Sequence, residues 1–71
     1  MQEELIRMLR AVPFYPFIIC TRDGEAEHVD SVERLSVGKN VCAYVDTAGY
    51  ISLIPYTAID RIITRDSPEI M

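Results

Sequence analysis

The sequence predicts a mainly β domain in which an N-terminal helix precedes a small antiparallel barrel of five strands. Two observations predict it: an amphipathic pattern confined to the first eleven residues, and short apolar runs joined by tight turns in the remainder. The chain has 71 residues, whereas two cores need roughly 100 residues apiece, so we expect one domain over residues 1–71. Hydrophobic strands would leave open edges in a flat sheet, and closure into a barrel removes such edges.

The first expected element is a helix over residues 2–11. Leu5, Met8 and Leu9 recur at the spacing that places apolar side chains on one side of a helix. Acidic residues stand in the first turn and arginines toward the end, as the helix dipole favours, and Pro13 stops the pattern. A helix of about ten residues is unstable alone in water, so its apolar side must pack on the strands.

The strands are expected at approximately residues 17–22, 25–32, 40–45, 50–54 and 59–64. Asp23-Gly24 separates the first two and is the strongest short-range signal of a hairpin. A second tight turn falls between the third and fourth strands, and a single helical turn precedes the last. The path of residues 30–39 has two interpretations, a bent continuation of the second strand or a connection that crosses the core.

Charge and residue types narrow the function classes. Seven basic residues stand against eleven acidic ones, a net charge of −4, whereas nucleic-acid binding draws most of its affinity from lysine and arginine. Nucleic acid is therefore disfavoured as a partner. The single histidine, His28, has no nucleophile or set of metal ligands near it in the sequence. Cys20 and Cys42 stand far apart, each within a run of apolar residues, which is typical of structural thiols. We expect no enzyme activity, no cofactor and no metal.

Location and membrane contact follow from the apolar runs. None approaches the roughly 18 residues that a membrane helix needs, and acids near the N-terminus are unlike a secretory signal. We expect a cytoplasmic protein with no membrane partner.

Self-association is expected because a domain of this size buries only about 60% of the surface that its unfolded chain exposes. The last two strands supply more apolar surface than one chain can easily cover. We therefore predict a homo-oligomer in which a strand of one chain is added to a strand of the next. The predicted interface residues are Ile51, Leu53, Ile59, Ile62 and Ile63.

The helix, the Asp23-Gly24 hairpin and the ending IPYTAIDRIIT (residues 54–64) resemble the Sm-like family, in particular the bacterial RNA chaperone family Hfq. The resemblance implies a helix and five strands, assembly by pairing of the fourth strand with the fifth of the next subunit, and an RNA-contacting segment at Tyr56 and Thr57. The chaperones have a lysine-histidine pair at these two positions, and their base-stacking aromatic residue aligns with Cys20. The implied RNA binding is therefore weak.

A second stretch, LRAVPFYPF (residues 9–17) followed by Asp23-Gly24, is similar to a set of short bacterial proteins, and this likeness implies no activity. Two function hypotheses follow. One is a non-enzymatic, oligomeric Sm-like barrel that acts as a scaffold or binding module with weak RNA binding. The alternative is an SH3-like module that binds a protein partner and has no nucleic-acid role.

Overall fold

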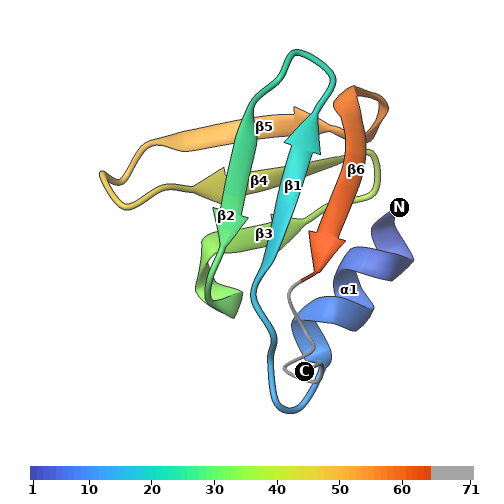
Figure 1. The fold of residues 1–71 in the computed structure, drawn as a ribbon, viewed down its shortest axis with the longest axis vertical. Helices are drawn as coiled ribbons and strands as arrows, with labels where there is room; N and C mark the ends of the chain where they lie inside the picture. Colours follow the sequence, from blue (N-terminus) through green and yellow to red (C-terminus); the bar gives the residue numbers. More distant parts are fainter. Residues whose placement is uncertain (65–71) are drawn as a thin grey trace.

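The structure is a computed structural model, and it describes residues 1–64. Two antiparallel three-stranded sheets face each other with their strands crossing at a steep angle, and one helix lies beside them (Figure 1). The strand orders are β2-β1-β6 and β3-β4-β5. The elements are α1 (Gln2–Arg10), β1 (Phe17–Thr21), β2 (Ala26–Val29), η1 (Val32–Arg34), β3 (Leu35–Val37), β4 (Val41–Val45), β5 (Ile51–Pro55), η2 (Tyr56–Ala58) and β6 (Ile59–Thr64).

The predicted N-terminal helix is confirmed and ends one residue before the expected position. Leu5 is fully buried, and Met8 and Leu9 pack against the core from the next turn. The helix contacts β3 and lies beside the end of β6, so it covers one side of the space between the sheets (Figure 1). Its apolar side is therefore stabilised by the strands, as a helix of nine residues requires.

The predicted hairpin at Asp23-Gly24 is also confirmed. The Thr21 amide donates to the Glu25 carbonyl oxygen at 3.0 Å, and Gly24 adopts a φ of +95°, which glycine reaches without a steric cost. β1 lies between β2 and β6, and Phe17 and Ile19 point from it into the core. Alternate residues of β1 therefore anchor the first sheet.

The predicted mainly β, antiparallel architecture is confirmed, but the small barrel of five strands is wrong in two respects. The described chain has six strands, and their ladders form two separate sheets, so no hydrogen-bonded barrel closes. The second expected strand, residues 25–32, ends at Val29, and the chain turns through η1 before β3 pairs with β4. The chain has to leave one sheet and enter the other, and this change of direction replaces one bent strand with two short strands.

The core lies between the sheets and contains only apolar side chains and Tyr44. Its buried residues are Leu5, Phe17, Ile19, Val29, Leu35, Cys42, Tyr44, Ile54 and Ile59. The Tyr44 hydroxyl donates to the His28 carbonyl oxygen at 2.9 Å, which links β4 of one sheet to β2 of the other. The core therefore holds the sheets together by apolar packing and by one buried hydroxyl whose hydrogen bond is satisfied.

Candidate interaction site

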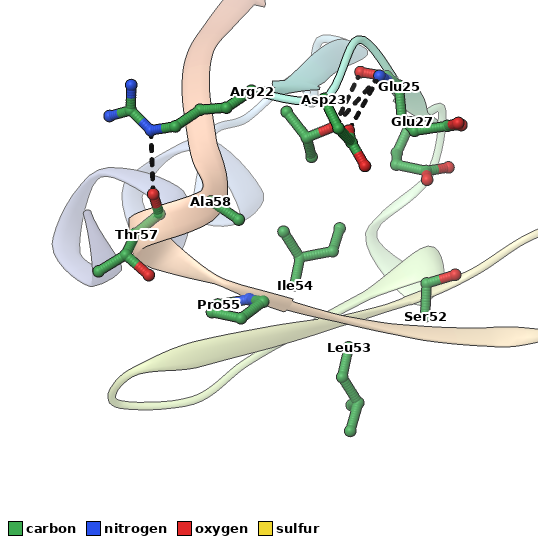
Figure 2. A pocket seen from close by; sticks show the side chains of 11 residues that line it. Arg22, Asp23, Glu25, Glu27, Ser52, Leu53, Ile54, Pro55, Thr57 and Ala58 are labelled. Atoms are coloured by element: carbon green, nitrogen blue, oxygen red, sulfur yellow. Dashed lines mark hydrogen bonds between the residues drawn. The ribbon is translucent and has the colours of Figure 1, made fainter.

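A groove of about 520 Å³ lies between the β1–β2 hairpin and β5 (Figure 2). Hairpin residues line one side of it, and β5 with Thr57 and Ala58 of η2 lines the other. The lining residues are Thr21, Arg22, Asp23, Glu25, Glu27, Ser52, Leu53, Ile54, Pro55, Thr57 and Ala58. The groove is thus bordered by an edge strand, because β5 pairs with β4 alone in the described part of the chain.

The direction of the β5 backbone groups follows from the two hydrogen bonds at the ends of the β4–β5 ladder. Asp46 donates its amide to the Tyr50 carbonyl oxygen at 3.0 Å, and Tyr56 donates to the Asn40 carbonyl oxygen at 3.1 Å. Hydrogen-bonded and non-hydrogen-bonded pairs alternate along an antiparallel ladder.

In the register of β4 with β5, this alternation makes Tyr44–Ser52 and Cys42–Ile54 the hydrogen-bonded pairs. The amide and carbonyl groups of Ile51 and Leu53 therefore point away from β4, toward the free edge. Pro55 has a carbonyl group but no amide donor there. The edge thus offers two backbone donors to an added strand, one each from Ile51 and Leu53.

The hairpin gives the groove an acidic side. Asp23 accepts hydrogen bonds from the Thr21 hydroxyl and from the Glu25 amide, and these bonds lower the pKa of the Asp23 carboxyl. The Arg22 Nε donates to the Thr57 carbonyl oxygen at 3.0 Å, which ties the hairpin to η2. Asp23 and Arg22 therefore organise the turn, while the carboxylates of Glu25 and Glu27 line the groove without a described ion pair.

The two residues aligned with the chaperones' RNA-contacting pair lie in different environments. The Tyr56 ring packs against the core, and its hydroxyl donates to the Gly38 carbonyl oxygen at 2.6 Å. Thr57 is exposed, and its carbonyl oxygen accepts the Arg22 hydrogen bond. The structure thus gives the half-buried Tyr56 a packing role, and of the two side chains that of Thr57 is the more exposed.

The predicted interface residues also divide into two groups. Ile51 and Leu53 are 67% and 71% exposed, and Ile63 of β6 is 38% exposed. Ile59 is buried in the core, and Ile62 packs against it. The residues accessible to a second chain are therefore Ile51, Leu53 and Ile63.

The sequence reasoning missed a continuous apolar surface on the second sheet. Cys42, Tyr44 and Ile54 point inward from β4 and β5, and the residues between them point outward. We name this surface the outer β4–β5 face, and its residues are Val41, Ala43, Val45, Ile51, Leu53 and Pro55. The signal was present in the sequence, since VCAYV and ISLIP carry apolar residues at both alternations, with Ser52 as the only hydroxyl on the inner side of β5.

Within residues 1–64, no group of three or more histidine, cysteine, aspartate or glutamate residues could hold a metal ion, and no helix is long and apolar enough to cross a membrane. Comparison with protein-family models, with curated proteins and with solved structures finds no match to this chain.

Two tyrosines predict loss of stability in alkali: Tyr44, which is buried, and Tyr56, which is half-buried against the core. Burial raises the pKa of both Tyr44 and Tyr56 above the value of about 10 that tyrosine has in an unfolded chain. Between the unfolded and folded pKa values the native state binds more protons, so the free energy of unfolding falls as pH rises above about 10. Urea denaturation at pH 8 and pH 11 measures this loss. Tyr56→Phe should reduce the loss, and the exposed-site control Tyr50→Phe should leave it unchanged.

Proposed function

We propose that this protein is a non-enzymatic binding module that assembles with copies of itself by strand addition, the β5 edge of one chain receiving the β6 edge of the next. One observation carries the proposal. The free edge of β5 directs backbone donors and acceptors outward at Ile51 and Leu53, and the side chains of the same two residues are 67% and 71% exposed. Such an edge is a template for pairing with another chain.

β6 supplies a matching edge. It pairs only with β1 in the described chain and, with six residues, it is the longest strand. Ile62 packs against the core, so the next residue, Ile63, points to the outer side of its sheet. Adding β6 to β5 in one continuous sheet brings outer side chains beside outer side chains, and Ile63 then lies near Ile51 and Leu53. Cross-strand pairs of this kind contribute roughly 0.2–1 kcal/mol each.

The charges favour pairing of unlike edges. Glu25 and Glu27 border the β5 edge, whereas β6 exposes one acid, Asp60, and one base, Arg61, and so carries no net charge. Pairing β5 with a second β5 would bring two acidic hairpins together, and like charges in an interface disfavour that partner. Repeated β5-to-β6 contacts are heterologous, so they build a ring where the rotation closes. The resemblance to Sm-like proteins supports the same arrangement.

The test is the mass of the chain in solution. Light scattering at micromolar concentrations should give a mass several times that of the 8.1 kDa chain. A single 8.1 kDa species over a wide concentration range would reject self-assembly. It would favour the second candidate, a monomeric SH3-like module whose acidic groove binds an extended, basic peptide, because the free β5 edge and the carboxylates of Glu25 and Glu27 suit such a partner.

RNA binding is expected to be weak. The exposed Thr57 carries no charge, Tyr56 is occupied by packing, and the chain has a net charge of −4. A fluorescence titration with single-stranded RNA at physiological salt should give a dissociation constant no tighter than the roughly 10⁻⁴ to 10⁻⁶ M of non-specific binding. Submicromolar affinity that falls steeply with salt would contradict this expectation and restore an RNA-binding role.

A further inference from the structure

From the outer β4–β5 face we infer a second contact between copies of this chain: assemblies formed through the β5 and β6 edges stack on one another through this face. The inference rests on the proposed function, because the edges have to gather several faces first. Its basis is a pair of antiparallel strands, β4 and β5, whose outer side chains are all apolar. Antiparallel sheets ordinarily place one side on the core and the other, polar side in water.

The six residues of the face include no charged or hydrogen-bonding side chain, and on the β3 side the face ends at the exposed Ser36, opposite Ala43. Val41, Ala43 and Val45 of β4 lie directly opposite Pro55, Leu53 and Ile51 of β5, so the two rows form one continuous surface. Figure 2 shows Leu53 projecting from β5 on the side opposite to Ile54. In a chain with a net charge of −4, this is a surface on which two copies can meet without opposing charges.

The shape of the face is self-complementary. Ala43 is small, and its direct cross-strand neighbour is Leu53, which is large and 71% exposed. A low point and a projection therefore stand side by side at the centre of the face. A two-fold axis between them places each Leu53 over the Ala43 of the other copy, which is the reciprocal contact that an isologous interface requires.

The size of the face indicates which copies stack. Two strands about 4.8 Å apart and five residues of about 3.3 Å each cover roughly 10 by 17 Å. One such face is smaller than the roughly 800 Å² per partner that stable interfaces bury. Isolated chains therefore do not dimerise through it, whereas several faces held in one assembly act together and gain avidity.

The test uses Ala43→Arg in the full chain, with the mass measured by light scattering. β4 is the central strand of its sheet, so this change introduces a charge in the face and leaves the β5 and β6 edges intact. We expect a two-fold decrease in mass relative to the unmodified chain. Ala26→Arg is the matched control, because Ala26 is exposed on the other sheet, and the mass should not change.

The outcomes separate the two proposals. An unchanged mass for Ala43→Arg overturns stacking and leaves edge assembly standing. A fall to 8.1 kDa supports the face contact and overturns edge assembly, since the face would then be the sole interface. A monomeric unmodified chain overturns both. If circular dichroism shows that Ala43→Arg does not fold, Val41→Lys places a charge at the end of the same face and is judged by the same masses.

Discussion

Replacement of Leu5 by alanine is expected to lower the free energy of unfolding by about 2–5 kcal/mol. Leu5 has no exposed surface and lies in the core that the two sheets share, so its truncation leaves a cavity that short strands cannot easily fill. Native domains are stable by about 5–15 kcal/mol, and a chain of 71 residues belongs to the lower part of that range. The loss should therefore remove a large share of the stability, measurable by urea denaturation.

The matched control for this change is Val12→Ala. Val12 is 96% exposed just after α1, and truncation of such a side chain usually changes the stability by no more than about 0.5 kcal/mol. A Leu5→Ala loss well below 1 kcal/mol would mean that the helix does not rest on the sheets in solution. The expected large difference between the two variants thus tests the docking of α1 separately from its helical propensity.

Local signals made part of the fold predictable. The helix followed from the spacing of Leu5, Met8 and Leu9, and the first hairpin followed from Asp23-Gly24. Each of these patterns is complete within about ten residues, so the tertiary arrangement had little to change. The antiparallel pairing of β4 with β5 across a tight turn is predictable for the same reason, and Gly49 takes the positive φ, +92°, that this turn requires.

The division into two sheets was not predictable from local pattern. Residues 30–39 alternate between polar and apolar side chains, and both a bent strand and a crossing connection fit that pattern. The structure contains a 3-10 turn and the separate strand β3. Val29 is buried in the core from β2, which pairs with β1, whereas Leu35 is buried in the core from β3, which pairs with β4. Which sheet each of these side chains joins depends on long-range pairing, which the segment itself does not encode.

In the candidate site, too, local pattern predicted some features and long-range packing decided the others. Strand alternation correctly gives Ile51 and Leu53 one side of β5, but the sequence cannot show whether that side is the core or the outside. Ile59 and Tyr56 were assigned to surfaces, and the structure packs both on the core. Short apolar strands are ambiguous in this way, because either alternation is hydrophobic enough to be buried.

Two variants, each blocked at one edge, are expected to be monomeric alone and to form a dimer when mixed. Leu53→Pro removes the outward amide donor of β5 and leaves the ladder to β4 intact, since the Leu53 amide does not point toward β4. Ile63→Asp places a charge on the outer side of β6. We avoid Ile62 because its packing against the core would confound assembly with folding.

In an equimolar mixture the intact β6 of the first variant can join the intact β5 of the second, and no further chain can be added. Light scattering should therefore give 8.1 kDa for each variant and about twice that mass for the mixture. His28→Asp, an exposed change on the first sheet away from β6, should keep the mass of the unmodified chain. If the Ile63→Asp variant dimerises alone, β5 pairs with β5, and the head-to-tail arrangement is wrong. Mixing thus decides between unlike and like edges because the two arrangements give opposite results for the same pair of proteins.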